Sequence, residues 1–309
     1  LCYHGIWIGP EPHYGDRLFM SAERFAARMA LLARLGYRVI GLDEAMQRHL
    51  RGGSRARDLV ITIDDAWLGT YRHMLPVLER HGYPATLYVT TYYAQARRPV
   101  LNVLLGYLFS RPGGQAALSR LTPPDAPPEG RLEMIVRSVD ALPTLDARWQ
   151  EVQRLAGLVP GAPSIEVLAE SFGLMTPEQL RDAARRGLDI QLHTHTHRMH
   201  GQDPDRVAAE VMRNREELST ILARPPETFR HFCYPSGEHD PRVFDALTRV
   251  GVRSATTTEF GLVPATQHPL ALPRILDGES LSDLEITAML SGFWSIASQL
   301  RAKLQLGAP

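Results

Sequence analysis

The sequence is poor in cysteine, in long apolar runs and in net charge. Only Cys2 and Cys233 occur among 309 residues, which excludes a disulfide scaffold, and neither belongs to a Cys-x-x-Cys pair. No stretch reaches the roughly 18 consecutive apolar residues of a membrane helix. Because 34 basic residues balance 34 acidic ones, the total charge predicts no polyanion-binding surface, and nucleic acid is not an expected partner.

Two further signals are missing. The chain has no Gly-x-Gly-x-x-G fingerprint, which argues against a dinucleotide-binding fold. No signal-peptide pattern is present, but the chain starts as if inside a strand, so the compartment stays open between cytoplasm and cell envelope. The apolar fraction of 44% is sufficient for a substantial core, and the length suits one large α/β domain or two smaller ones.

Histidine is concentrated in one short stretch. Four of the 12 histidines lie between His193 and His200, directly after an apolar run. Neutral imidazole is the commonest transition-metal ligand in proteins. A helical turn or tight loop would bring His193 and His197 together, and a continued strand would put both on one face with His195. The alternative is a polar loop that is merely rich in histidine.

A second polar pair follows an apolar run far upstream. Residues 58–63 are rich in β-branched side chains, which is typical of a buried parallel strand, and Asp64 and Asp65 come directly after it. The carboxyl end of such a strand is where α/β enzymes keep their chemistry. Two adjacent carboxylates resist joint ionisation unless a cation is near. The alternative is a helix N-cap, for which one aspartate would suffice.

The periodicity predicts strands and helices in alternation, hence a parallel sheet or barrel. Ser21 and Thr176, the latter with Gln179 in a capping box, are expected to begin helices, Gly82 is expected to end one, and residues 7–20 are expected to be a loop. Residues 94–165 interrupt the alternation, and we interpret them as a helical insertion, a candidate cap beside the active site, within one domain covering 1–309, with helices near 131–142 and 146–157. The apolar run 101–109 inside it is either a core helix or a surface facing substrate or lipid. A closing helix is expected over about 281–304, and the expected strands are 1–6, 37–40, 58–65, 85–90, 188–192, 229–234, 252–257 and 272–275.

Five blocks, in order, resemble the polysaccharide deacetylase (NodB-homology) family, carbohydrate esterase family four. Thr62-Ile-Asp-Asp-Ala66 resembles its Thr-Phe-Asp-Asp-Gly motif, and His193-Thr-His-Thr-His197 fits its His-(Ser/Thr)-x-x-His motif. Phe232-Cys-Tyr-Pro-Ser-Gly237 is similar to the Phe-Ala-Tyr-Pro-Tyr-Gly form of the third motif. Tyr3-His-Gly5 and Leu272-Pro-Arg-Ile275 also look like this branch.

The resemblance implies an irregular (β/α) barrel, often seven-stranded, with its site at the carboxyl ends of the strands. It assigns Asp65, His193 and His197 to a divalent metal, with zinc expected. Three protein ligands with an open position are the pattern of a catalytic zinc. Asp64 would be the general base that takes a proton from the attacking water.

The resemblance also implies roles for residues other than the metal ligands and the general base, although some of these positions depart from the family motif. In many relatives an arginine of the third motif holds the general base, but Cys233 stands at that place here, and Arg274 is our candidate substitute. The backbone N–H of Ser236 is expected to bind the oxyanion. Residues expected to contact substrate or line its pocket are Tyr234, Trp67 and His4.

Three departures from the family pattern matter. Ala66 replaces a glycine, and Ala fits less easily if the position needs a positive φ. Ser236 stands where an aromatic is common, which changes the pocket wall. No Leu-x-His block supplies the general acid. His268 lies in the right region, although its neighbours do not match, and the other candidates are His195, His200 and His4.

The expected function is a metal-dependent hydrolase that removes N-acetyl groups from amino sugars of a polysaccharide or glycoconjugate. One alternative keeps the fold and hydrolyses a small non-sugar amide. Another is a non-catalytic metal- or saccharide-binding protein, motivated by Ala66 and the missing acid. Asp64 argues against the latter, because metal binding alone would not require it. The glycan, the choice between N- and O-acetyl groups and the oligomeric state stay open.

Overall fold

The computed structural model describes residues 1–96 and 98–293. A sheet of seven strands lies at its centre, and neighbouring strands pair in parallel throughout. Their order is β1 (Cys2–Tyr3), β6 (Ile61–Ile63), β7 (Ala85–Val89), β8 (Leu188–Leu192), β9 (His231–Cys233), β10 (Ser254–Phe260) and β11 (Leu272–Arg274).

The first and last strands of this sheet meet, so it is nearly closed into a barrel. Just beyond β11, Leu276 forms a parallel bridge with Cys2. The Cys2 N–H donates to the Ile275 carbonyl at 2.9 Å, and the Asp277 N–H donates to the Cys2 carbonyl at 3.2 Å. Closure leaves neither edge strand open to another chain. The predicted irregular seven-stranded (β/α) barrel is confirmed.

Two small parallel sheets lie beside the barrel. One pairs β2 (Gly5–Ile6) with β3 (Phe19–Met20), and the other pairs β4 (Arg38–Val39) with β5 (Asp58–Leu59). The prediction of one continuous strand over 1–6 is therefore wrong, because His4 separates β1 from β2. Residues 7–20, expected to be a loop, end in strand β3.

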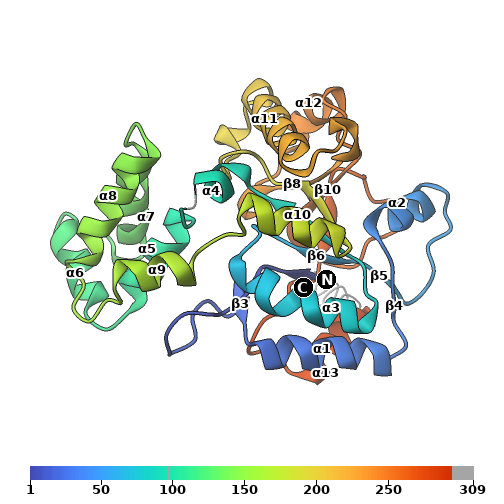
Figure 1. Ribbon diagram of the computed structural model, residues 1–309, viewed down its shortest axis with the longest axis horizontal. Helices are drawn as coiled ribbons and strands as arrows, with labels where there is room; N and C mark the ends of the chain where they lie inside the picture. The colour runs from blue at the N-terminus through green and yellow to red at the C-terminus, as the bar shows by residue number, and fades with distance from the viewer. Residues whose placement is uncertain (97, 294–309) are drawn as a thin grey trace, which may run out of the picture.

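Helices surround the sheet, as Figure 1 shows. Ser21 caps the first helix by accepting the Arg24 N–H at 3.2 Å, and Thr176 forms the predicted capping box with Gln179. A π-helical turn at Thr70–Met74 precedes α3. The surrounding helices are α1 (Ala22–Arg34), α2 (Leu42–Leu50), α3 (Leu75–His81), α10 (Pro177–Arg185), α11 (Pro204–Leu222), α12 (Phe244–Arg249) and α13 (Asp283–Leu290).

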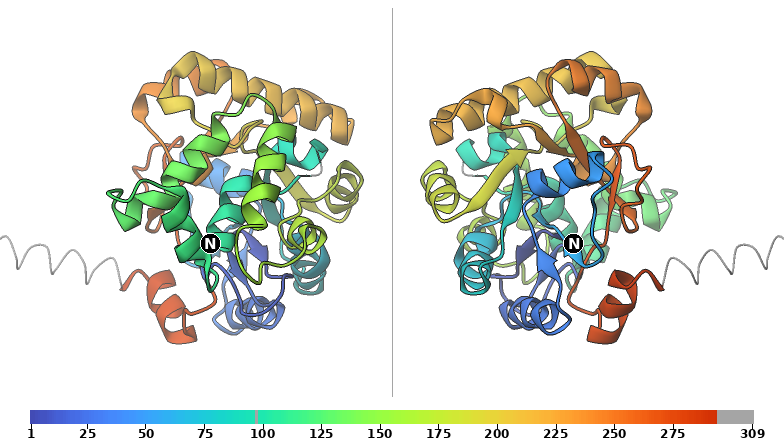
Figure 2. Two further views of the ribbon diagram at one scale, coloured as in Figure 1. Left: turned by 90° about the vertical axis from the view of Figure 1, so that its left-hand side faces the viewer. Right: turned by 90° about the vertical axis from the view of Figure 1, so that its right-hand side faces the viewer.

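The predicted insertion forms a helical lobe beside the barrel, at the left of Figure 1 and facing the viewer in the left view of Figure 2. Its apolar run 101–109 is core: Leu104, Leu105 and Leu108 are at most 1% exposed, so a lipid-facing role for this run is wrong. The helices of this region are α4 (Thr91–Ala96), α5 (Leu101–Ser110), α6 (Gly114–Leu121), α7 (Pro128–Asp140), α8 (Leu145–Ala156) and α9 (Ile165–Ser171).

An aromatic cluster joins this lobe to the barrel. Trp7 and Phe19 from the barrel side lie 5.5 Å apart between ring centroids, and Trp7 lies 5.6 Å from Tyr107 of α5. Phe172, just after α9, contacts Trp7 at 5.5 Å and Trp67 at 6.5 Å. Such edge-to-face contacts add to the burial of large apolar rings. The core of the lobe is thus continuous with side chains next to the candidate site.

The closing helix is shorter in the described chain than predicted. α13 begins at the Ser282 capping box and ends at Leu290, whereas residues 294–304 of the predicted helix lie outside the described residues. Within the described part, no helix is long and apolar enough to cross a membrane.

Candidate active site

The polar residues predicted from separate motifs meet at the carboxyl ends of the barrel strands. Asp64 and Asp65 follow β6, His193 follows β8, Cys233 ends β9 and Arg274 ends β11. Carboxyl ends of parallel strands converge on one end of a barrel, which is why residues so far apart in sequence become neighbours.

Asp65 and two histidines form a compact cluster. Asp65 Oδ1 lies 3.1 Å from His193 Nε2 and 3.2 Å from His197 Nε2, and one ligand atom from each residue lies within 4.8 Å of the others. His193 Nδ1 donates to the Cys233 carbonyl at 2.8 Å, which leaves Nε2 with a lone pair facing the cluster. Metal-ligating histidines in proteins are oriented in this way.

The donor set fits a divalent transition metal. Two imidazole nitrogens and one carboxylate are the ligands that zinc and its neighbours accept, and fewer than four protein ligands leave room for water or substrate. Burial would raise the pKa of Asp65, but the adjacent imidazoles of His193 and His197 hold it well below the ordinary value. The carboxyl is therefore ionised, as a ligand must be.

The turn that carries Asp65 has a left-handed backbone. Asp65 and Ala66 have φ values of 72° and 70°, a region where a residue other than glycine pays about 1 kcal/mol or more. The expected strain at Ala66, where the family has glycine, is thus present. Trp67 Nε1–H donates to Asp65 Oδ2 at 2.9 Å and helps to fix the carboxylate.

Asp64 points to a different partner. Arg274 donates to both its oxygens at 2.8 Å, in a two-pronged pair whose members are 2% and 5% exposed. Arg274 also donates to the Thr257 carbonyl at 2.7 Å, which aims the guanidinium. Burial would raise the pKa of Asp64, but the charge and hydrogen bonds of Arg274 lower it to about 2. Arg274 thus occupies the position that we expected of it.

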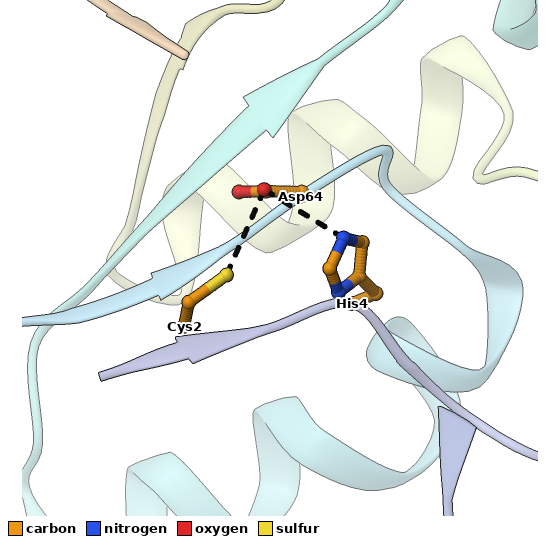
Figure 3. A group of neighbouring side chains, drawn as sticks. All are labelled: Cys2, His4 and Asp64. Carbon is orange, nitrogen blue, oxygen red and sulfur yellow. Dashed lines mark hydrogen bonds and ion pairs between the residues drawn. The ribbon is translucent and has the colours of Figure 1, made fainter. Parts of the chain in front are cut away.

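Two thiols and one imidazole complete the surroundings of Asp64. Figure 3 shows Cys2 and His4 approaching Asp64 from β1 and the residue after it. Cys2 Sγ and Cys233 Sγ lie 3.7 and 3.4 Å from Asp64 Oδ2, and His4 Nε2 lies 3.8 Å from the same oxygen. Burial raises the pKa of Cys2, so its thiol keeps its proton. His4 Nδ1 is buried without a hydrogen-bond partner in the described chain.

Helix α11 supports the loop of residues 193–200, which carries four histidines and is called the histidine loop below. Asn214 is fully buried; its Oδ1 accepts the His193 N–H at 2.9 Å, and its Nδ2 donates to Thr91 Oγ1 at 3.0 Å. One turn earlier, Glu210 accepts the Thr196 N–H at 2.8 Å and the Thr196 hydroxyl at 2.9 Å. Both side chains stand on one face of the helix, as residues four apart do.

That loop needs support because its backbone is strained. Thr194 and His197 both have a φ of 59°, and His200 has a φ of 48°. Left-handed conformations outside glycine persist only where surrounding contacts fix them. The hydrogen bonds from α11 supply such contacts and thereby set the direction of the candidate ligand side chains.

A cavity of about 290 Å³ opens beside the cluster. His197 and Ser236 are among its lining residues, so it reaches both the candidate metal cluster and the expected oxyanion donor. Ser236 has a φ of 55° within the 3₁₀ turn Pro235–Gly237 and is exposed. Residues from α5 and α7 of the insertion line the opposite wall.

Two of the residues expected to contact substrate are interior instead. Trp67 and Tyr234 are each 1% exposed and do not line the cavity. Trp67 hydrogen-bonds Asp65, and the Tyr234 hydroxyl donates to the Leu270 carbonyl at 2.9 Å. Each ring packs in the core and its polar atom finds a protein partner, so packing is the observed role and contact with substrate stays a prediction.

The four histidines considered as general acids have different surroundings in the structure. His268 is exposed, stacks on Phe244 with ring centroids 4.7 Å apart, and accepts the Leu270 N–H through Nδ1. His195 Nδ1 pairs with Thr91 Oγ1 at 2.9 Å, and His200 Nε2 lies 3.2 Å from Glu210. Within the described residues, only His4 among these four contacts Asp64.

Sequence reasoning missed Asn214, Glu210 and Cys2. The charged, Ala-rich pattern of α11 indicates a solvated helix and gives no signal that two of its polar side chains face inward. Cys2 lies one residue before a recognised block and carries no motif of its own.

Solved structures with low sequence identity share this fold. The deacetylase PplD from Streptococcus pyogenes, solved in complex with acetate, matches with a TM-score of 0.62 at 16% identity over 94% of this chain and 96% of its own. IcaB from Ammonifex degensii matches with a TM-score of 0.60 at 17% identity over 94% and 96%. A de-N-acetylase from Aggregatibacter actinomycetemcomitans gives 0.58 at 14% over 94% and 98%. No curated protein sequence matches the chain.

Fold and site together define a parallel-barrel hydrolase with an Asp-His-His cluster beside an Asp-Arg pair. The family model for polysaccharide deacetylases matches residues 51–255, about two thirds of the sequence. The chain therefore belongs to the polysaccharide deacetylase family, as its motifs indicated. Membership implies hydrolysis of amide bonds and an acetylated saccharide as substrate.

Proposed function

We propose that the protein is a metal-dependent hydrolase that removes N-acetyl groups from amino sugars of a polysaccharide or glycoconjugate. The observation that carries this proposal is the convergence of Asp65, His193 and His197 next to the buried pair of Asp64 and Arg274. A metal-binding protein without turnover would need the first group but not the second.

Asp65, His193 and His197 would hold the metal. When bound, a divalent ion supplies positive charge that makes water more acidic and polarises the amide carbonyl. Asp64 then takes the proton from the attacking water. Arg274 keeps the carboxyl ionised and aims it, consistent with a pKa lowered to about 2. The Ser236 N–H, at the rim of the cavity, would donate to the oxygen on which negative charge develops.

The leaving amine needs a proton, and His4 is our candidate to supply it. Its Nε2 lies 3.8 Å from Asp64 Oδ2, which is longer than a hydrogen bond. After a small approach of the two groups, a proton taken by Asp64 would return through this imidazole to the nitrogen as the C–N bond breaks. His268 lacks such a contact in the described chain. The products are acetate and a free amine.

The cavity favours a sugar over a small anionic amide. Among the described residues that line it, Arg198 is the one arginine, and Asp140 pairs with this guanidinium. A site built for a small acid would offer an unpaired cation instead. We propose that barrel and insertion act as one catalytic unit, because both line this cavity.

Acetate release is the test of the proposed activity. The protein, loaded with zinc, cobalt or nickel in turn, is incubated with N-acetylated oligosaccharides and with small linear and cyclic amides. Acetate and new amines appearing together from the saccharides support the proposal. Turnover only of the small amides would contradict it and favour the non-sugar alternative.

A further inference from the structure

The helical insertion forms one wall of the cavity that contains the candidate metal ligand His197. On the barrel side the cavity is lined by the histidine loop and by residues after β9. On the other side it is lined by Asn102 of α5 and by Val136 and Asp140 of α7, with Tyr93 of α4 beside them. A substrate that reaches the metal cluster through this cavity must pass these side chains.

An ion pair fixes this wall relative to the histidine loop. Arg198, the residue after His197, pairs with Asp140 at the last residue of α7. Both side chains are about one-third exposed, at 33% and 36%. Together with the aromatic contacts between α5 and the barrel, this ion pair holds Asn102 and Asp140 near the Asp65–His193–His197 cluster.

The cavity carries more negative than positive fixed charge. Its carboxylates are Asp140 and Glu238, and its one guanidinium, on Arg198, is paired with Asp140. His200 faces Glu210 behind the loop. Within the described residues, Glu238 has no ion-pair partner and the Asn102 amide has no hydrogen-bond partner. Both are therefore available to a ligand.

We propose that the insertion is the specificity wall of the site. Asn102 and Asp140 contact the sugar ring that bears the acetamide or the ring next to it. Glu238, which faces the insertion from the barrel side and has no ion-pair partner among the described residues, favours neutral or amine-bearing sugars over sugars with a carboxylate or phosphate, because like charges repel. This inference rests on the proposed deacetylase function.

The size of the cavity agrees with such a role. About 290 Å³ lies at the lower end of ligand-binding cavities, which span roughly 300–1,000 Å³. It therefore accommodates about one sugar ring, and the rest of a glycan chain must lie outside the cavity.

The test compares two oligosaccharides of equal length: one of N-acetylglucosamine alone, and one in which N-acetylglucosamine alternates with a uronic acid. We expect the neutral substrate to have a kcat/KM about tenfold higher or more. Glu238→Gln should raise kcat/KM for the acidic substrate several-fold relative to that for the neutral one. Asn102→Ala should raise KM for the neutral substrate with little change in kcat.

Glu129→Gln is the control, because Glu129 is, like Glu238, an exposed carboxylate but lies on α7 of the insertion and does not line the cavity. It should behave as wild type with both substrates. Equal kcat/KM values for the neutral and the acidic substrate would overturn the specificity wall but not the proposed function. The same holds if Glu238→Gln and Asn102→Ala both behave like this control. No acetate release from either saccharide overturns the proposed function and this inference with it.

Discussion

At the scale of single residues, the site depends on buried charges that satisfy one another. Asp64 and Arg274 are paired through two hydrogen bonds of 2.8 Å and are almost fully buried. Such a pair is costly to desolvate, so its presence adds little to stability compared with apolar residues of similar size. The pair is better explained by the need for an ionised, aimed carboxylate in the proposed reaction.

A double-mutant cycle tests this pair. Asp64→Leu or Arg274→Met alone leaves one buried charge unpaired, and each should lower the free energy of unfolding by about 3–5 kcal/mol. The double variant should be more stable than either single one, and all three should lack deacetylase activity. Denaturant unfolding and acetate release are the measurements. Additive losses of stability would contradict the coupling.

The depressed pKa of Asp64 predicts a pH dependence of stability. A carboxyl with a pKa of about 2 when folded and about 3.9 when unfolded stabilises the fold above the unfolded value. That contribution, about 2.5 kcal/mol, is lost as the pH falls through 4 toward 2. Unfolding curves at successive pH values should show this loss in wild type and not in Arg274→Met. The same acid profile in both would show that Arg274 does not lower the pKa.

The proton route is tested by comparing two histidines. His4→Gln should lower kcat by a factor of about 100 or more, the usual range for general acid–base groups, and should change its pH profile. His268→Gln should stay within about threefold of wild type, because the His268 side chain, within the described residues, contacts Phe244 and the Leu270 N–H and neither Asp64 nor the histidine loop. The reverse ranking would return the acid role to His268.

At the scale of elements, α11 positions the histidine loop. Asn214 fixes the backbone at His193, and Glu210 fixes Thr196 and His200. The strained φ values of this loop make it dependent on those contacts. Neither residue is expected to touch the substrate, so both are positioning residues.

Removing the support from α11 should weaken metal binding before it affects the fold. Asn214→Ala and Glu210→Gln should lower zinc affinity about 10- to 100-fold, as substitutions behind metal ligands typically do. Competition with a chromophoric chelator measures the affinity, and the spectrum of bound cobalt reports the ligand geometry. Glu216→Gln, at an exposed position on the same helix, should bind zinc like wild type. Unchanged affinity in both inward-facing variants would exclude the positioning role.

Short-range sequence signals predicted helices and strands where the chain carries strong capping residues or a regular apolar pattern. Ser21, Thr176 and the glycine after α3 marked helix ends that the structure confirms. The shortest strands were not predictable, because two residues such as Phe19 and Met20 become a strand only through pairing with β2. The inward face of α11 was missed for a similar reason: Asn214 and Glu210 find their partners across the fold, not along the helix.

At the scale of the whole molecule, barrel closure creates the site. The candidate ligands and the Asp64–Arg274 pair come from β6, β8 and β11, which only a nearly closed sheet brings to one end. The five motif blocks allowed the Asp65–His193–His197 cluster and the pairing of Arg274 with Asp64 to be anticipated. The interpretation of the insertion as a cap placed it near the site, but its contacts could not be predicted, because they depend on the packing of Trp7, Phe172 and Tyr107.

The central claim is that ligand and base roles are divided between neighbouring residues. Metal content by mass spectrometry, measured with acetate release, tests it in wild type, His193→Ala and Asp64→Asn. We predict bound metal and activity in wild type, loss of both in His193→Ala, and metal without activity in Asp64→Asn. Absence of metal in wild type after reconstitution, or an active Asp64→Asn enzyme, would contradict the account.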